Sequence, residues 1–313
     1  MFNTFAQRDY LLRLARSRML LVLAGTLLLA VAACSSSDGP IISEERDPNF
    51  PYFFAQVITT DMAVGQSRIS FGISSAEGMP IRTEEATVRS YFLVPNEDTR
   101  VLKSTVLAHF VPWPTNVEGI FEAILDFDLV GNWQLEVDFI SPDGTAETAK
   151  SAFSVKEVSS TPPIGAPAPA TVTLTAGDVE DLSHISSSPE PDPDLYQLSI
   201  HEALQQDKPL VVVFATPAFC VSATCGPQVA ELAKVKDQYA ARANFIHVEV
   251  FKNPHLIGGG QRPGLDDTVP AVKEWGLPTE PWTFVIDAQG LLRAKYEQFT
   301  PSDVIEAALL EAF

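Results

Sequence analysis

The residues with the most evident chemistry are two cysteines, Cys220 and Cys225, with four residues between them. The third cysteine of the chain, Cys34, lies near the N-terminus. Two close thiols can form a disulfide, exchange it with other thiols, or bind a soft metal ion such as Cu(I). Residues five apart in one regular helix have Cα atoms about 8–9 Å apart, whereas a disulfide spans roughly 4.4–6.8 Å. If the two cysteines pair, Cys220 must therefore lie in a loop, with the helix beginning near Pro227.

The N-terminal residues 1–33 have the pattern of a secretory signal. A basic start precedes an apolar run over residues 19–33, which is shorter than the ~20 residues that a spanning helix usually needs. The run ends in Val31-Ala32-Ala33-Cys34, which resembles a bacterial lipobox. This resemblance implies cleavage before Cys34 and lipidation of its thiol and new amino group, for instance with palmitate. An ordinary signal peptide and an uncleaved anchor helix are the alternatives.

These features predict a lipoprotein of the bacterial cell envelope. The protein would be anchored to a membrane through lipidated Cys34, with its domains facing the extracytoplasmic side. Residues 34–49 contain Ser35-Ser36-Ser37 and are predicted to form a flexible tether. Export would place Cys220 and Cys225 in a compartment where disulfides persist.

The charge of the chain restricts its partners. The sequence has 40 acidic and 21 basic residues, which gives a formal net charge of −19. Such a surface repels nucleic-acid phosphates and, without an anchor, an anionic membrane. Gly258-Gly259-Gly260 lacks the Gly-Lys-Ser/Thr ending of a phosphate-binding loop. We therefore expect no nucleic-acid partner and no cofactor. The expected partners are envelope proteins with thiols or disulfides.

Residues 50–157 show the alternation typical of β-strands. Apolar residues occupy every second position in residues 68–73 and again in residues 133–139, so each strand has one buried and one wet face. Turn residues such as Pro142-Asp143-Gly144 separate the strands. Gly131-Asn132-Trp133, with the alternation after it, resembles the last strands of immunoglobulin-like domains in bacterial envelope proteins. An all-β immunoglobulin-like sandwich is therefore predicted, with a partner that the sequence does not identify.

A change of composition separates this region from the C-terminal part. Residues 158–194 are rich in Pro, Ser and Asp and are predicted to be a linker. From residue 195 onward, β and α patterns alternate. The apolar run 210–215 predicts a strand buried on both faces, and Pro227 opens a helix that continues to about Ala241. The predicted elements that follow are a strand (245–251), a short helix (269–275), a strand pair (282–287 and 291–296) and a final helix capped by residues 300–303.

This order of elements resembles the thioredoxin superfamily over residues 195–313. The resemblance rests on three motifs: Val211-Val212-Val213-Phe214 before the cysteines, Cys225-Gly226-Pro227 at the helix start, and residues 276–287 around Pro281. It implies an α/β thioredoxin-like domain with a cis peptide bond at Pro281, facing the cysteines. It also implies a thiol–disulfide oxidoreductase that acts through Cys220 and Cys225.

The spacing of the cysteines departs from the family's pattern. Members of the family usually have two residues between the cysteines, whereas this chain has four. Measured from the strand, Cys220 lies near the family's first cysteine, with an extra residue in the loop. Measured from the helix, Cys225-Gly226-Pro227-Gln228 matches the family's Cys-Gly-Pro-Cys, with Gln228 in place of the second cysteine. The sequence leaves both registers open.

The roles of the site residues follow from their expected places. Cys225 would lie just outside a helix N-terminus, where the dipole and the free N–H groups favour a thiolate, while Cys220 would be the more accessible sulfur. One thiolate would attack a substrate disulfide and the other would resolve the mixed disulfide. Glu280 precedes Pro281, so its carboxylate would disfavour a nearby thiolate, relay a proton during exchange, or face solvent.

Two other functions fit the same residues. In the first, the disulfide only staples a loop, and the chain is a non-catalytic binding lipoprotein. The second is copper delivery, because copper-assembly proteins of the Sco type bind copper with two cysteines and a distant histidine. The spacing here is one residue longer than in those proteins, and the candidate histidines are His247 and His255. His247 lies in an apolar strand and is expected to be a core histidine, so no resident metal is predicted.

Overall fold

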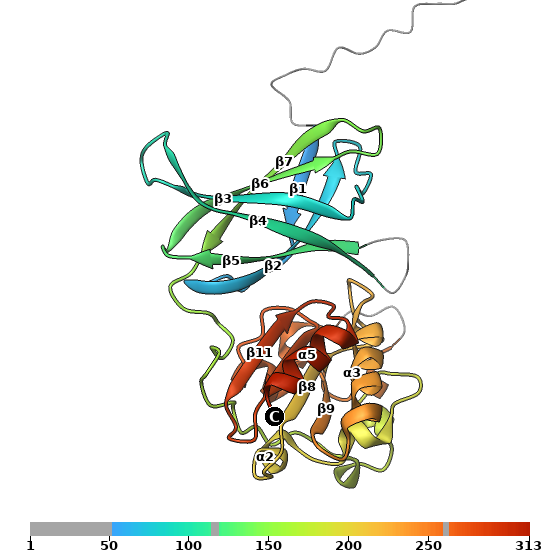
Figure 1. Ribbon diagram of the computed structural model, residues 1–313. Coiled ribbons are helices and arrows are strands. Elements are labelled where there is room, and N and C mark those ends of the chain that lie inside the picture. The colour runs from blue at the N-terminus through green and yellow to red at the C-terminus, as the bar shows by residue number, and fades with distance from the viewer. Residues whose placement is uncertain (1–51, 114–118, 259–262) are drawn as a thin grey trace, which may run out of the picture. The chain divides into compact units, whose positions relative to one another are not determined.

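The computed structural model describes residues 52–113, 119–258 and 263–313 (Figure 1). The predicted signal peptide, lipobox and tether, with Cys34, lie outside the described residues. Within the described ranges, no helix is long and apolar enough to cross a membrane.

The N-terminal part of the described chain is a closed barrel of seven strands (Figure 1). Most neighbouring strands pair antiparallel, and the barrel closes where β1 and β7 pair in parallel at Phe54 and Lys150. The strand order around the barrel is β1-β2-β5-β4-β3-β6-β7. The strands are β1 (Phe53–Val57), β2 (Gly65–Ser75), β3 (Glu85–Leu93), β4 (Arg100–Pro112), β5 (Gly119–Phe127), β6 (Gly131–Ile140) and β7 (Ala146–Val155).

The alternating apolar residues of these strands fill the interior of the barrel. Ile69 and Phe71 on β2 are fully buried, as the alternation in residues 68–73 predicted. Trp133 on β6 is also fully buried, and its ring centroid lies 4.9 Å from that of Phe127 in an edge-to-face arrangement. The indole N–H of Trp133 donates to the carbonyl of Leu129 at 3.0 Å, so this large aromatic residue is buried with its polar atom satisfied.

The prediction of an immunoglobulin-like sandwich is therefore wrong. The seven strands form one closed sheet instead of two stacked sheets. Alternation establishes only that each strand has one buried face, and the inside of a barrel meets that requirement as well as the space between two sheets does. What decides between them is the pairing of β1 with β7, which joins residues 96 positions apart in the sequence (150 − 54).

The C-terminal part contains a second sheet, of four strands in the order β11-β10-β8-β9 (Figure 1). β8 and β9 are parallel, and β10 is antiparallel to both β8 and β11. The strands are β8 (Leu210–Ala215), β9 (Asn244–Glu249), β10 (Trp282–Ile286) and β11 (Leu292–Glu297). The α-helices are α2 (Ile200–Ala203), α3 (Cys225–Tyr239), α4 (Pro270–Glu274) and α5 (Ser302–Glu311).

The predicted thioredoxin-like α/β class is also wrong. The described chain is mostly β, with a seven-stranded barrel and a four-stranded sheet but only four α-helices. No clear thioredoxin fold is present among these residues. Only α3 and α5 are longer than five residues. The short helix predicted at residues 269–275 is α4, which begins at Pro270. Gly276, with a φ of 62°, follows its end, where a left-handed glycine commonly terminates a helix.

The segment predicted as a linker packs against the C-terminal sheet. It forms three short 3₁₀ turns, η1 (Ala176–Asp178), η2 (Leu182–His184) and η3 (Pro193–Tyr196). Ala168 and Ile185 from this segment join the hydrophobic clusters that cover the sheet. The abundance of proline therefore does not prevent the segment from contributing to the core.

The barrel core yields a stability prediction. Trp133→Ala should lower the free energy of unfolding by about 3–5 kcal/mol, because it empties a fully buried site and deletes the contact with Phe127. Urea unfolding followed by circular dichroism measures the change. Ile140→Ala is the control, since this side chain on the same strand is 55% exposed and its truncation should cost less than about 0.5 kcal/mol. Equal losses in the two variants would contradict the assignment of Trp133 to the core.

Candidate functional site

Strand β8 and helix α3 position the two cysteines. All six residues of β8 are buried, and the chain leaves the sheet after Ala215. A loop of nine residues, 216–224, leads to Cys225, the first residue of α3. Cys220 lies in this loop and forms a disulfide with Cys225, with 5.9 Å between the Cα atoms. The separation agrees with the geometric expectation that a paired Cys220 lies outside the helix.

The two sulfur environments differ. The Cys225 side chain is fully buried in the cluster on this face of the sheet, whereas Cys220 is only partly buried. The backbone N–H of Cys225 donates to Sγ of Cys220 at 3.3 Å, and Oγ of Ser222 lies 3.4 Å from the same sulfur. Ser222 in turn lies 2.7 Å from Oγ1 of Thr224. The hydrogen-bonding groups of the loop therefore converge on Cys220.

Gln228 fixes the first turn of α3 to the neighbouring elements. Its side chain is fully buried, and its Nε2 donates to Oγ1 of Thr283 on β10 at 3.1 Å. Its Oε1 accepts the backbone N–H of Thr300 at 2.7 Å, and Nε2 lies 3.3 Å from the carbonyl of the same residue. Both ends of a buried amide are thus satisfied, so Gln228 holds the helix start against β10 and the chain before α5.

Glu280 and the cysteine loop line one groove. The peptide bond between Glu280 and Pro281 is cis, and Pro281 is buried while Glu280 is partly buried. Val221 and Ser222 from the cysteine loop contribute to a groove of about 620 Å³ to which Thr279 and Glu280 also contribute. Val221 is 65% exposed. The structure therefore brings Glu280 and the loop of Cys220 to a common surface depression.

The histidines that the sequence offered as copper ligands are engaged in other contacts. His247 is buried on β9; its Nδ1 lies 2.6 Å from the Tyr196 hydroxyl and its Nε2 lies 3.1 Å from the carbonyl of Ala215. The exposed ring of His255 stacks on that of His184, with the centroids 4.0 Å apart. Across the described ranges, no three His, Cys, Asp or Glu side chains are grouped closely enough to hold a metal ion.

Burial lowers the pKa of His247 to about 4, so its ring is neutral at neutral pH. A carbonyl can only accept a hydrogen bond, so Nε2 carries the proton and donates to Ala215, while Nδ1 accepts from Tyr196. This histidine therefore ties β9 to the last residue of β8, immediately before the cysteine loop.

Two polar residues of this region were not assigned a role from the sequence. Ser222 had no nucleophile motif around it, and its contact with Cys220 depends on the turn that the loop makes. Glu249, at the end of β9, accepts the backbone N–H of Ser187 at 2.8 Å, and Oγ of Ser187 accepts the N–H of Ala218 in the cysteine loop at 3.1 Å. A glutamate at the end of an apolar run was the one signal in the sequence that could have pointed to the contact between Glu249 and Ser187.

Comparisons with known proteins identify no relatives. No protein-family model matches the chain, and no curated protein matches it. Among solved structures, one similar chain is a superoxide reductase (neelaredoxin) from Ignicoccus hospitalis, at 12% identity over 34% of this chain and 82% of that one, with a TM-score of 0.20. Another is a β-glucosidase from Kluyveromyces marxianus in complex with glucose, at 14% identity over 35% of this chain and 15% of that one, also with a TM-score of 0.20. Similarities this low carry no argument about fold or function.

The buried His247 makes stability depend on pH. Its folded pKa, about 4, lies below the ordinary value of 6.5, so the unfolded chain takes up a proton first as the pH falls. The stability from this group is complete above pH 6.5 and is lost as the pH decreases toward 4. Between pH 7 and pH 5 the loss should be about 2 kcal/mol. Urea unfolding at the two pH values measures the loss of unfolding free energy. In His247→Gln, which retains a donor for Ala215, this loss should be smaller than in the wild type by about 2 kcal/mol. An unchanged pH dependence in the variant would contradict a neutral, buried His247.

Proposed function

We propose that this protein is an extracytoplasmic, membrane-anchored thiol–disulfide oxidoreductase that acts through Cys220 and Cys225. The observation that carries the proposal is the asymmetry of the pair: Cys225 is fully buried, whereas the partly buried Cys220 accepts a hydrogen bond and lies beside a groove-lining loop residue, Ser222. A disulfide that serves only as a staple needs neither an accessible sulfur nor donors directed at it. An exchanging disulfide needs both.

The described disulfide corresponds to the oxidised protein. A thiolate of a substrate dithiol attacks Sγ of Cys220, forming a substrate–Cys220 bond while the Cys220–Cys225 bond breaks and Cys225 leaves as a thiolate. The second substrate thiol, after losing its proton, attacks the substrate sulfur of the mixed disulfide. The substrate leaves with its own disulfide, and Cys220 and Cys225 retain the two electrons as thiols. With a substrate disulfide, the same steps run in reverse.

Cys220 is the sulfur assigned to the mixed disulfide. The N–H of Cys225 and the hydroxyl of Ser222 lie 3.3 and 3.4 Å from it, and both can donate to a developing thiolate. The sequence favoured a thiolate at Cys225 because of the helix N-terminus. In the structure the N–H at that terminus is directed at Cys220 instead, and burial of Cys225 restricts access to it.

The groove beside the cysteine loop gives the substrate a place to lie. Val221 is exposed and apolar, so it can contact a substrate side chain, and Glu280 provides a carboxylate in the same depression. A carboxylate at this position can accept a proton from an incoming thiol, which is one of the three roles considered for Glu280 from the sequence.

Single-cysteine variants test which sulfur is attacked. Full-length Cys225→Ser, with Cys220 free, should form a stable mixed disulfide when incubated with oxidised glutathione, whereas Cys220→Ser should form little because Cys225 is buried. Intact-protein mass spectrometry measures the adducts. Ser222→Ala in the Cys225→Ser background should slow adduct formation, because it removes a donor to the thiolate. Faster modification of Cys225 than of Cys220 would reverse the assignment.

The reduction potential of the pair separates exchange from a structural role. Equilibration of the wild-type protein in graded thiol buffers should give a value between about −120 and −270 mV, the range of exchanging oxidoreductases. A value below about −300 mV would show a structural staple and overturn the proposed activity.

The anchor is proposed separately, on the lipobox resemblance of residues 31–34. In bacterial cells that export the protein, Cys34→Ser should abolish incorporation of labelled palmitate and move the protein from the membrane fraction to the soluble fraction. Cys220→Ser, which removes a different thiol, should leave both unchanged. Membrane retention of Cys34→Ser without a lipid label would favour the uncleaved anchor helix.

A further inference from the structure

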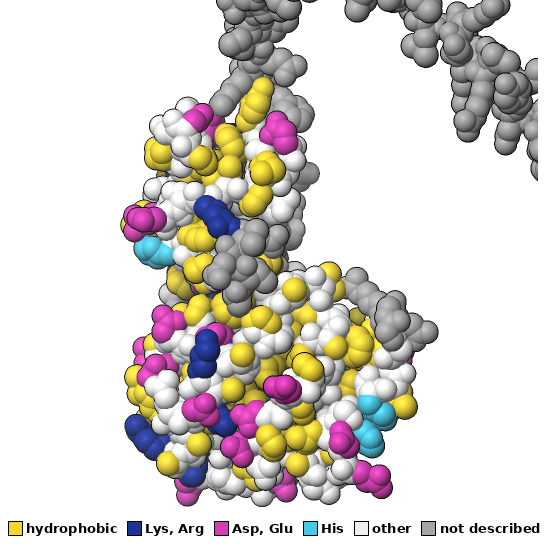
Figure 2. Space-filling view, turned by 90° about the vertical axis from the view of Figure 1, so that its right-hand side faces the viewer, with side chains coloured by type: hydrophobic (Ala, Val, Ile, Leu, Met, Phe, Trp, Pro, Cys, Tyr) yellow, Lys and Arg dark blue, Asp and Glu magenta, His cyan; other side chains and the backbone are white. Residues whose placement is uncertain are grey.

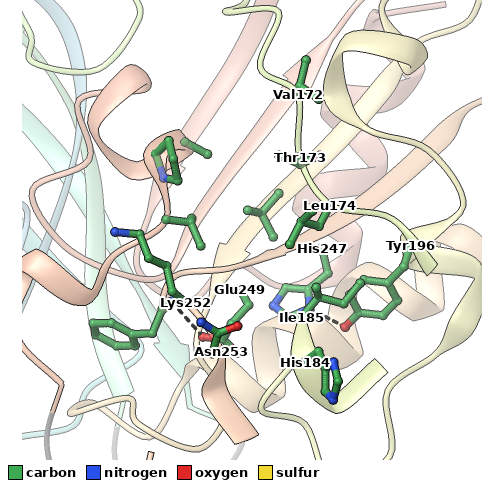
Figure 3. Close-up of a pocket in the computed structure, with 15 residues that line it drawn as sticks. Val172, Thr173, Leu174, His184, Ile185, Tyr196, His247, Glu249, Lys252 and Asn253 are labelled. Atoms are coloured by element: carbon green, nitrogen blue, oxygen red, sulfur yellow. Dashed lines mark hydrogen bonds between the residues drawn. The ribbon is translucent and has the colours of Figure 1, made fainter. Parts of the chain in front are cut away.

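A second cavity lies beside β9, with its own set of lining residues (Figure 3). Its volume is about 280 Å³. Its lining includes the extended segment of Val172, Thr173 and Leu174, and Val248 from β9. Small-molecule sites in proteins have volumes of roughly 300–1,000 Å³, so this cavity lies just below the lower end of the range and restricts a ligand to a small organic molecule.

The walls of the cavity are mainly apolar. Leu174 and Ile185 face the cavity from the segment before β8, and Figure 3 shows both close to His247 and Tyr196. Leu174 is 61% exposed and its neighbour Val172 is 80% exposed, so apolar surface continues from the cavity to the outside. Exposed apolar side chains beside a concave site are typical of a binding entrance.

Glu249 lines the polar end of the cavity. Only 4% of this residue is exposed. One carboxylate oxygen accepts the N–H of Ser187 at 2.8 Å, and the other accepts the N–H of Val250 at 3.0 Å and lies 3.4 Å from that of Phe251. These neutral donors orient the carboxylate but do not balance its charge, and burial raises the pKa of Glu249.

No cation of the described residues balances that charge. Lys252 also lines the cavity, but its Nζ donates to the carbonyl of Asp266 at 3.3 Å, on the outer surface. His247, on the same strand as Glu249, is neutral, with both ring nitrogens hydrogen-bonded. A buried carboxylate without an opposite charge is costly, and a ligand that brings a positive charge removes that cost.

We propose that this cavity binds a small primary amine, with its apolar group between Leu174, Ile185 and Val248 and its ammonium group on Glu249. The geometry supplies both parts of such a ligand with a partner: an apolar wall and a buried anionic acceptor at one end. The net charge of −19 favours the same class, because it attracts cations to the protein and repels carboxylates. Figure 2 shows acidic side chains more abundant than basic ones on the face that it presents.

Three probes that share a phenylethyl group and differ in charge test the proposal. Full-length protein in a mild non-ionic detergent is titrated by calorimetry with 2-phenylethylamine, 2-phenylethanol and 3-phenylpropanoate, each against a detergent blank. The amine should bind about tenfold more tightly than the alcohol, because it forms a charged hydrogen bond to Glu249, and the carboxylate should not bind. Equal affinities for amine and alcohol, or no binding of the amine up to about 10 mM, would overturn the proposal.

Variants locate the binding. Glu249→Gln keeps a hydrogen-bond acceptor and the size of the side chain but loses the charge. It should therefore remove the preference for the amine over the alcohol and leave the affinity for the alcohol unchanged. Glu190→Gln changes the net charge equally at an exposed residue outside the cavity, and its preference should match the wild type. Leu174→Arg places a cation at the exposed entrance, so it should weaken binding of the amine. This variant tests the site even if Glu249→Gln does not fold. Retention of the full preference in Leu174→Arg and in a folded Glu249→Gln would place the amine elsewhere.

Discussion

The complete burial of strand β8 is the constraint on which the C-terminal part depends. β8 lies between β9 and β10, and all six of its residues are buried, so both faces of the strand must be covered. Helix α3 covers one face, with Leu232 and Val235 in the same cluster as Val211 and Val213. To reach that face, the chain leaves β8 at Ala215, crosses the end of the sheet and enters α3 at Cys225. This path buries Cys225 completely in that cluster, whereas Cys220, in the loop, packs against the cluster and stays partly exposed.

Part of this arrangement could be predicted from the residues. The run of apolar residues 210–215 established a strand buried on both faces, and the distance argument placed Cys220 in a loop. The fold class was not predictable in the same way. Local alternation sets which face of a strand is buried, but closure of the barrel depends on Phe54 pairing beside Lys150, a contact between distant residues. In the C-terminal part, helices and strands lie where they were predicted. The helices are short, however, and the elements do not form the thioredoxin-like fold that their order suggested.

The candidate site shows the same division. Cys220, Cys225, Glu280 and Pro281 were found from their types and positions. The partners of the sulfur were not, because the contact of Ser222 depends on a loop conformation in which Ala223 has a φ of 57°. The role of Glu249 was hidden for a related reason: Ser187 belongs to a segment whose composition is that of a linker. A composition rich in proline and serine does not reveal that a hydroxyl will be held under the cysteine loop.

Glu249 also connects the two proposed sites, because the same carboxylate lines the cavity and holds Ser187, whose hydroxyl accepts the N–H of Ala218. An ionised carboxylate is a stronger acceptor than a protonated one. An ammonium group bound in the cavity would keep Glu249 ionised, and would thereby strengthen its hold on Ser187 and, through it, the start of the cysteine loop.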